Sequence, residues 1–515
     1  MKHLIRMIAA LLVLVMTLTA MPVIAAAEET PEPADDQSLC RIALPKKPDL
    51  LDGNECSTAT MVFIYEVFDT LTKLQPDGTL APCLATEWNQ VDDLTWQFKL
   101  REGVVYSDGS PFNADCVVET LTYLATKDPA FKYKAKWASS WPISVEKLDD
   151  YTVNIHTQTP SFECPALLSR NGIWPVGATS HYEDFVKSPV GTGAYKVESY
   201  SLAENITLVR NDLYWGEPAK IERLSYDIIT DQSAMSIALA AGTYDAYLGI
   251  TYDDAQDMEK NPGKYDTVLF NQESLGMQYL FFNGRSKNPF IQDVNFRKAM
   301  TYAIDHAGIL EYLLYNYVEP GRGVTAVTAG IQNVYVSEGY PAYDPAKAQE
   351  LAKACGYNGE EIKLFYVSGQ FTNDLEITEL IVSELIDAGF NINMQEVEAS
   401  TWSSTRPTDT YDIALNSCSG SFTGQPTDYI TQVLGKSAGW TWDHVDELIN
   451  KAYSAGTTEE EFGQLIQQAC KEAWEEMPYL WATERIYQYA LDPKLVGLET
   501  LATGYVRMSN AYFAK

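Results

Sequence analysis

The sequence predicts an α/β protein of two or three domains, and three observations support this fold class. The chain has 515 residues, which corresponds to roughly two or three domains at about 150 residues each. Residues 95–124 carry strand, turn and helix signals in close succession, and residues 362–416 carry strand, helix, strand and strand signals. Mixed orders of this kind are typical of α/β lobes.

The composition indicates a globular protein that does not bind nucleic acid. Hydrophobic residues make up 46% of the chain and aromatic residues 12%, which provides a sizeable core and flat side chains that can line a cleft. The formal net charge is -33. Proteins that bind phosphate backbones carry patches of Lys and Arg, and no such basic run occurs here. The acidity favours solubility outside the cell.

The first residues predict export. Lys2 and Arg6 precede an apolar stretch over residues 7–20, and Ala25 and Ala27 form the small-x-small pattern of a signal peptidase site. We therefore expect a signal peptide over residues 1–27, cleaved near Ala27, and a periplasmic or extracellular cell-surface protein. No later segment approaches the ~20 apolar residues of a membrane span.

The mature chain is expected to begin with a flexible leader. The segment Glu28–Ser38 is polar and predicts no packing of its own. Cys40 lies too far downstream of the cleavage point to carry a lipid anchor, so we expect none.

The cysteines and histidines predict no metal site. Eight cysteines are an even number in an exported chain, which permits disulfides but equally permits buried thiols. The five histidines are scattered without the spacing of a zinc site. We expect no metal and no cofactor.

The first elements are predicted by strand, turn and capping signals. Residues 95–100 (TWQFKL) alternate as a half-buried strand does, and residues 107–109 (SDG) supply a turn with a position of positive φ. A helix should follow, because Asn113 is a good N-cap and Asp115 favours the first turn. Its buried stripe is expected to contain Val117, Val118, Leu121 and Leu124.

Later elements follow the same rules. Asp344 should cap a helix that begins at Pro345 and ends before Gly356. The period of the apolar residues over 296–307 predicts another helix. In the C-terminal part the expected elements are a strand over 362–367, a helix over 376–388 that Gly389 ends, and strands over 390–394 and 411–416.

Each candidate catalytic motif lacks a residue or an arrangement that its chemistry requires, so we expect that the protein is not an enzyme. Gly191 and Gly193 lack the third glycine and the helix of a dinucleotide loop. The stretch SGSFTG has Phe422 where a nucleophile elbow needs Ser. Neighbouring acids such as Asp253 and Asp254 point apart in regular structure, which favours a solvated face over an acid/base pair.

Several segments in a fixed order resemble one family. The stretch VFDTLTKLQPDGTLAPCLATEWNQVDDLTWQFKLREGV, together with GTGAYKVESY, LVRNDLYWGEPAKIERLSYDII, FFNGRSKNPFIQDVNFRKAMTYAID and YDPAKAQELAKACGY, is similar to extracellular solute-binding proteins of family 5. These are the peptide- and nickel-binding components of ABC importers. The resemblance spans nearly the whole mature chain.

This resemblance implies a two-lobe fold of the periplasmic-binding-protein type II (Venus-flytrap) class, with a subdomain inserted in the first lobe. The boundaries that it implies are 28–65, 187–278 and 481–515 for lobe I, 66–186 for the inserted subdomain and 279–480 for lobe II.

The resemblance also implies the ligand-binding residues. They are Asn54, Glu55, Cys56, Trp402, Arg406, Ser419, Ser421, Phe422 and Thr423. Trp402 would stack on the ligand, with a core role as the alternative. Arg406 would clamp a carboxylate, and a surface position is equally compatible with its sequence context.

One departure from the family affects the expected ligand. Peptide-binding members place an Asp before a turn that corresponds to Gln425-Pro426-Thr427, where it pairs with the α-ammonium of the peptide; here Ser421 or Phe422 stands there. Either Glu55 supplies this charge, or the ligand lacks a free amino terminus.

The expected function follows. The resemblance implies a monomeric binding protein that captures di- or oligopeptides in an interlobe cleft and delivers them to the transmembrane subunits of an ABC permease. The alternatives are an oligosaccharide or blocked peptide as the ligand, or a sensing or adhesion role at the surface.

Overall fold

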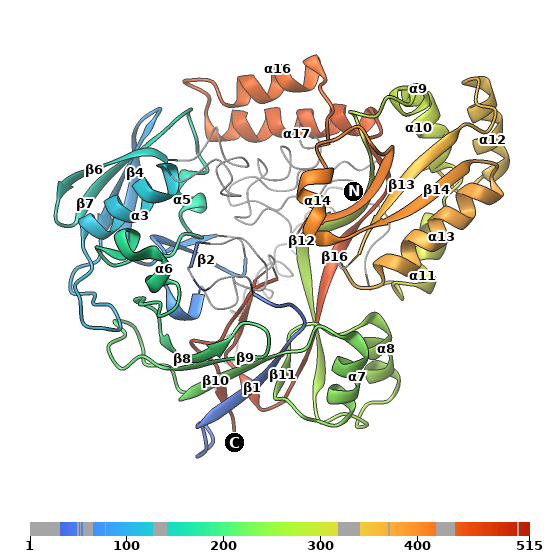
Figure 1. Cartoon of the computed structure of the whole chain (residues 1–515). Helices are drawn as coiled ribbons and strands as arrows, with labels where there is room; N and C mark the ends of the chain where they lie inside the picture. Colours follow the sequence, from blue (N-terminus) through green and yellow to red (C-terminus); the bar gives the residue numbers. More distant parts are fainter. Residues whose placement is uncertain are drawn as a thin grey trace, which may run out of the picture.

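The computed structural model describes residues 31–48, 51, 53–54, 65–77, 79–126, 142–317, 340–368, 371–418, 438–501 and 504–515. Figure 1 shows two α/β regions joined by long strands, with a separate sheet at one side. The class is the two-lobed α/β type that the sequence predicts.

Ten strands of the described chain form one large sheet. Their order is β14 (Asn391–Val397), β13 (Glu361–Val367), β15 (Ile413–Cys418), β12 (Val268–Phe282), β16 (Tyr479–Leu491), β11 (Ala246–Tyr247), β1 (Leu39–Leu44), β10 (Arg223–Ile228), β9 (Asn205–Arg210) and β8 (Tyr195–Ser201). β12 has 15 residues and β16 has 13, and they pair antiparallel. These two strands therefore connect the two halves of the sheet.

Each half of the sheet contains parallel pairs. β1 pairs in parallel with β10 and β11, and β13 pairs in parallel with β14 and β15. Parallel strands need crossover connections, and helices on the sheet faces provide them. The exact lobe boundaries implied by the resemblance stay a prediction.

The separate sheet confirms the elements expected around residues 95–124. It contains β4 (Ala85–Asp92), β5 (Thr95–Leu100), β7 (Thr152–Thr157) and β6 (Pro142–Asp149). Gly109 has φ +87° in the turn, and the side chain of Asn113 accepts a hydrogen bond from the N–H of Asp115 at the start of α3 (Ala114–Thr126). The predicted stripe was wrong at one position, because Val118 is half-buried and Thr120 is buried instead.

Short elements complete the first region and the C-terminal segment. They are β2 (Thr72–Leu74), β3 (Leu80–Pro82), α5 (Cys164–Leu167), the 3-10 helix Ala178–His181, α6 (Tyr182–Phe185), β17 (Leu495–Val496), β18 (Glu499–Thr500), β19 (Val506–Arg507) and β20 (Tyr512–Phe513).

The Gly-Thr-Gly segment before β8 permits a close approach of two chain segments. A Cβ at Gly191 would lie 1.8 Å from the carbonyl oxygen of Val67, and one at Gly193 would lie 2.4 Å from that of Glu66. The N–H of Gly193 donates to the carbonyl of Val67 at 3.0 Å. The two glycines are therefore required by packing.

The helices between residues 294 and 387 agree with the prediction except at one place. α12 (Pro345–Ala354) is capped by Asp344, and α13 (Asp374–Asp387) is followed by Gly389 with φ +92°, as expected. The single helix expected over 296–307 is instead two helices, α10 (Val294–Thr301) and α11 (His306–Tyr312). Asp305 separates them, because its carboxylate accepts from the N–H of Gly308 and starts the second helix.

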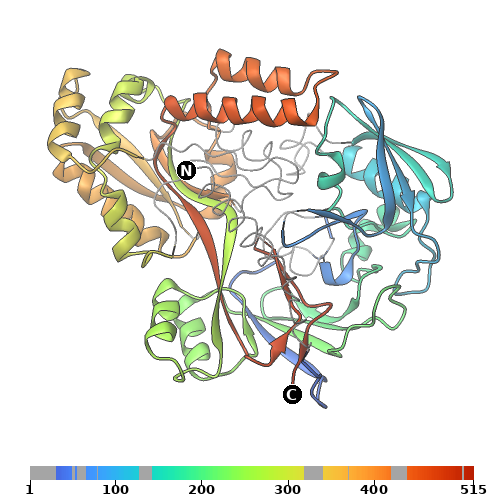
Figure 2. The ribbon, with the colours of Figure 1, turned by 180° about the vertical axis from the view of Figure 1, so that it is seen from behind.

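The remaining helices are α7 (Gln232–Ala240), α8 (Tyr252–Lys260), α9 (Pro289–Gln292), α14 (Ala399–Thr405), α16 (Asp443–Ala452) and α17 (Glu459–Glu475). α16 and α17 lie across the space between the separate sheet and the β13–β14 half of the large sheet (Figures 1 and 2).

The prediction of a flexible leader was wrong for residues 31–38, the part of it that the structure describes. The N–H of Ala34 donates to the carbonyl of Phe513 at 2.7 Å, and the N–H of Phe513 donates to the side chain of Gln37 at 2.9 Å. Lys515 pairs with Glu32 at 2.8 Å. These contacts with the other end of the chain provide the order that the polar sequence alone does not predict.

Candidate functional site

A cavity of about 420 Å³ lies beside the long strands. Its lining residues come from the segments that follow β1, β10 and β11, from the starts of α7 and α8, from β12 and β16, from the loop between β13 and α13, and from the loop between β18 and β19. They are Leu44, Pro45, Lys46, Lys47, Ile229, Thr230, Gln232, Met235, Leu248, Gly249, Ile250, Thr251, Tyr252, Gln278, Phe371, Thr372, Ile486, Tyr487, Gln488, Tyr489 and Gly504.

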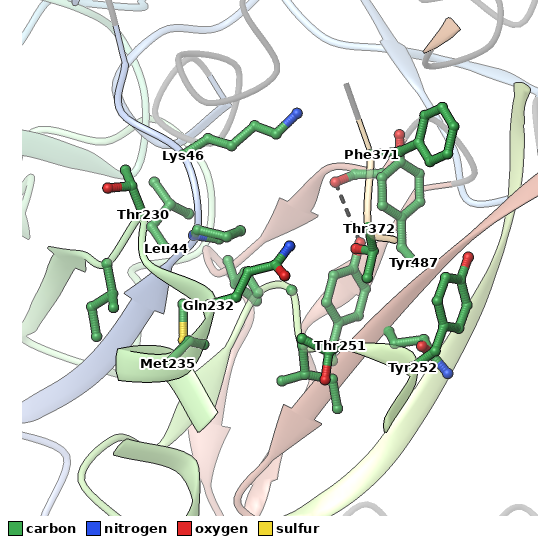
Figure 3. Close-up of a pocket in the computed structure, with 18 of the residues that line it drawn as sticks. Leu44, Lys46, Thr230, Gln232, Met235, Thr251, Tyr252, Phe371, Thr372 and Tyr487 are labelled. Carbon is green, nitrogen blue, oxygen red and sulfur yellow. Dashed lines mark hydrogen bonds between the residues drawn. The ribbon is translucent and has the colours of Figure 1, made fainter. Parts of the chain in front are cut away.

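One wall lies at the carboxyl ends of parallel strands. β1 ends at Leu44, β10 at Ile228 and β11 at Tyr247, and the segments that follow these strands contribute to the lining. In open α/β sheets, ligands bind in the crevice outside such strand ends. The helices α7 and α8 begin next to this wall (Figure 3).

Gln278 contributes a buried polar group to the lining. Its side chain is 1% exposed, and neither Nε2 nor Oε1 has a hydrogen-bond partner within the described part of the chain. Gln278 lies opposite Ser417 of β15 and Thr483 of β16 in the sheet. A buried amide without partners costs about 1 to 3 kcal/mol, so its position at a cavity indicates a group that a ligand would satisfy.

The opposite wall is aromatic. The rings of Tyr487 and Tyr489 stack with centroids 6.4 Å apart and an interplanar angle of 6°. Gly504 has φ +83°, and a Cβ there would lie 2.1 Å from Cζ of Tyr487, so only glycine leaves room for this ring. The Nε2 of Gln488 donates to Oδ1 of Asn271 at 3.2 Å. This second glutamine is paired with another side chain, whereas the amide of Gln278 has no partner among the described residues.

The charged groups on the lining are basic. Lys46 and Lys47 follow β1, and the described lining residues contain no Asp or Glu. Figure 3 shows the side chain of Lys46 extending over the cavity toward the side on which Phe371 lies.

Of the residues expected at the site, Asn54 is hydrogen-bonded to residues 171 and 172. Its side chain is 1% exposed, its Nδ2 donates to the carbonyl of Gly172 at 2.8 Å, and its Oδ1 accepts from Nδ2 of Asn171 at 2.9 Å. It does not belong to the lining of the cavity described above.

Trp402 and Arg406 lie on neighbouring turns of one short helix. Trp402 is in α14 and Arg406 is its C-cap, and the N–H of Arg406 donates to the carbonyl of Trp402 at 2.8 Å. The Trp402 ring is 7% exposed and packs against Phe281 and Tyr411, with centroids 6.4 and 5.6 Å away. These contacts give Trp402 a place in the core, and a ligand contact for either residue stays a prediction.

The other expected residues, Glu55, Cys56, Ser419, Ser421, Phe422 and Thr423, lie outside the described residues. Their role in ligand binding therefore also stays a prediction.

Metal and membrane features can be assessed for the described residues. They contain no group of three or more His, Cys, Asp or Glu side chains placed to hold a metal ion. No helix among them is long and apolar enough to cross a membrane. The cysteines at 40, 83, 116, 164, 355 and 470 are free thiols.

The sequence interpretation missed Gln278 and the two lysines. Gln278 lies within the apolar stretch LGMQYLFF, where one polar residue gives no distinct signal. The lysines follow a strand, as binding residues in α/β proteins do, and that position is the signal that could have identified them.

The comparisons with known proteins place the chain in a family of binding proteins. The model of the bacterial extracellular solute-binding proteins, family 5, matches residues 79–440. The chain therefore belongs to this family. Its members are the solute-binding proteins of ABC importers, and the family is one of binding proteins and not of enzymes.

Individual relatives differ in what their names say they bind. The chain is 26% identical over 479 residues to heme-binding protein A of Haemophilus influenzae, covering 85% of each chain. It is 25% identical over 357 residues to the glutathione-binding protein GsiB of Escherichia coli, covering 68% of this chain and 67% of the relative. The fold matches that of the periplasmic binding protein DppA from Helicobacter pylori in complex with the peptide STSA, with a TM-score of 0.78, 21% identity and coverage of 93% of this chain and 98% of that one.

Proposed function

We propose that this protein captures di- or oligopeptides in the cavity between its two α/β regions and delivers them to the transmembrane subunits of an ABC permease. The importer role follows from the family. The peptide ligand is supported by the chemistry of the cavity, and the buried amide of Gln278 is the observation that carries it.

The amide of Gln278 needs a partner that both donates and accepts. Its Nε2 is a donor and its Oε1 an acceptor, and both lack partners among the described residues. An extended peptide supplies this pair, because the N–H and C=O of one residue point to the same side of the strand. One ligand residue can therefore satisfy both atoms of Gln278.

The rest of the lining suits side chains of a peptide. Leu248, Ile250 and Met235 offer apolar surface, and Phe371, Tyr487 and Tyr489 offer aromatic faces. Ligand sites generally combine a mostly apolar wall with a few placed polar groups. The peptide-complexed structure and the glutathione-binding relative are examples of peptide ligands on this fold and in this family.

The test separates ligand binding from stability. Gln278→Met removes both polar atoms at similar length, so we expect the unliganded variant to be as stable as the wild type or more stable, because a buried unpaired amide is lost. Its affinity for a synthetic tripeptide pool should fall about 10- to 100-fold, which corresponds to the ~1 to 3 kcal/mol of an unmade hydrogen-bond pair. Calorimetric titration measures the affinity, and thermal melting measures the stability.

The matched control is Gln488→Met. Gln488 is also a lining residue of the cavity, but its side chain donates to Asn271, so loss of this side chain should lower stability. Peptide affinity that is unchanged in Gln278→Met, or a large loss of stability in that variant, would contradict the assignment of Gln278 to the ligand.

A further inference from the structure

We propose that Tyr315 and Tyr317, in the segment that follows α11, fasten the two halves of the large sheet to each other and hold the unliganded protein in the closed arrangement. The closed arrangement is the one in which residues of both halves line the cavity. We call this contact the clasp; it joins Tyr315 and Tyr317 to Asp253 and Tyr252 of α8. The inference goes beyond the proposed function, because it concerns how the halves are held before any ligand binds.

α8 belongs to the β1 half, which is the half of the large sheet that contains β1 and β11. Ala255 and Met258 of α8 are buried. They lie in one hydrophobic cluster with Ala43 of β1 and Tyr247 of β11. Burial of this apolar face against the sheet fixes α8 to the β1 half.

The end of α11 belongs to the β13 half, which contains β13, β14 and β15. Ile309, Leu310 and Leu314 are buried in the same hydrophobic cluster as Leu364 of β13 and Ile413 of β15. Figure 1 shows α8 and α11 on the same side of the long strands β12 and β16. The two halves therefore meet beside these strands, at α8 and at the end of α11.

Two neighbouring tyrosines make the contacts between the halves. The hydroxyl of Tyr315 donates to the carboxylate of Asp253. The rings of Tyr317 and Tyr252 stack with centroids 6.1 Å apart and an interplanar angle of 23°. Tyr317 packs against both of the hydrophobic clusters, the one that contains α8 and the one that contains α11. The clasp therefore combines a charge-assisted hydrogen bond with an aromatic stack.

The backbone of the clasp is strained. Tyr315 and Asn316 have φ +49° and +58°. Asn adopts this left-handed conformation more readily than most residues, whereas a bulky residue such as Tyr rarely does. Such a conformation persists only where the surrounding contacts outweigh its cost, and strained residues of this kind cluster at switch regions. The bond to Asp253 and the stack on Tyr252 are contacts that offset the cost.

Separation of the two halves would break the clasp. Tyr252 also lines the cavity, so the clasp lies at the edge of the cavity, and a rotation that widens the cavity there pulls the clasp apart. Tyr315 and Tyr317 do not belong to the described lining. A protein that is held closed before binding has a larger binding-competent fraction, so the clasp raises the apparent affinity for the ligand of the cavity.

The experiment measures the radius of gyration of the unliganded protein by small-angle scattering. Tyr315→Phe removes only the hydroxyl that donates to Asp253, and the ratio of closed to open molecules should fall about fivefold, as expected for the loss of one hydrogen bond. The radius should therefore increase. Tyr315→Phe/Tyr317→Ala also removes the aromatic stack and should give a still larger radius.

The matched control is Tyr265→Phe. The hydroxyl of Tyr265 donates to Asp257 of the same helix, α8, but Tyr265 packs against the cluster of the β1 half. Its loss therefore breaks a bond of the same kind within one half, and this variant should keep the radius of the wild type.

A double-mutant cycle assigns the effect to the pair of Tyr315 and Asp253. Asp253→Ala should increase the radius as Tyr315→Phe does, and the two substitutions together should give no further increase, because each breaks the same contact. An unchanged radius in Tyr315→Phe/Tyr317→Ala, an equal increase in Tyr265→Phe, or additive increases in the cycle would overturn the inference. These measurements use no ligand, so their outcome is separate from that of the test of the proposed function.

Discussion

Glu66 is a carboxyl group that folding removes completely from water. Its side chain is 0% exposed, and Oε1 accepts from the N–H of Met508 at 2.5 Å. Burial raises the pKa of Glu66 to about 7, although the bond from Met508 and the nearby Arg507 oppose the shift. The group therefore holds a proton in the folded state at pH values where the unfolded chain has lost it.

This shift predicts how stability depends on pH. Between the unfolded pKa of 4.5 and about 7, the folded state binds more protons than the unfolded state, so the free energy of unfolding falls as pH rises through this window. The loss is on the order of 3 kcal/mol. Glu66→Gln keeps the acceptor for Met508 without the charge, and its stability should decline less than that of the wild type from pH 5 to pH 8. Urea denaturation at both pH values measures this, and equal declines would show that Glu66 does not titrate as predicted.

The other residue-scale lesson concerns local signals. Asn113, Asp344 and Gly389 could be assigned from the sequence because each acts on its immediate neighbours. The burial of Trp402 could not be predicted in this way, because it depends on Phe281, which belongs to the distant strand β12. The break at Asp305 was missed because the apolar period continues across it.

At the scale of elements, α16 and α17 contact the segment between β7 of the separate sheet and α5. The rings of Phe162 and Phe462 lie 5.9 Å apart, and the hydroxyl of Tyr453 donates to Oε2 of Glu163 at 3.4 Å. Phe162 precedes α5, whereas Tyr453 and Phe462 belong to the α16–α17 pair. These contacts join parts of the chain that a hinge at β12 and β16 would separate.

We therefore predict that Phe162→Ala opens the unliganded protein. An aromatic pair contributes about 1 kcal/mol beyond its buried area, so its loss should shift the ratio of closed to open molecules about fivefold. Small-angle scattering without ligand should give a larger radius of gyration for Phe162→Ala than for the wild type. The control Phe513→Ala truncates a half-buried ring elsewhere and should not change it. An unchanged radius in Phe162→Ala would show that this contact does not hold the regions together.

At the scale of the whole molecule, the fold class was predictable and the site was only partly so. The strand and helix order of residues 361–418 follows from periodicity and turn residues, and the family segments imply two lobes. The side chains that line the cavity could not be predicted, because Gln278 reaches it only through the pairing of β12 with β15 and β16. The order of residues 31–38 likewise depends on contacts with the far end of the chain.

The most direct test of the peptide assignment is to identify what the protein carries when it is purified without denaturation. Mass spectrometry of the solute released from this protein should find short peptides. The Gln278→Met variant, purified in parallel, should release much less of the same material, which excludes surface contaminants. Recovery of a metal chelate, a haem or a sugar from the wild type, with no peptide above the level of the variant, would contradict the account.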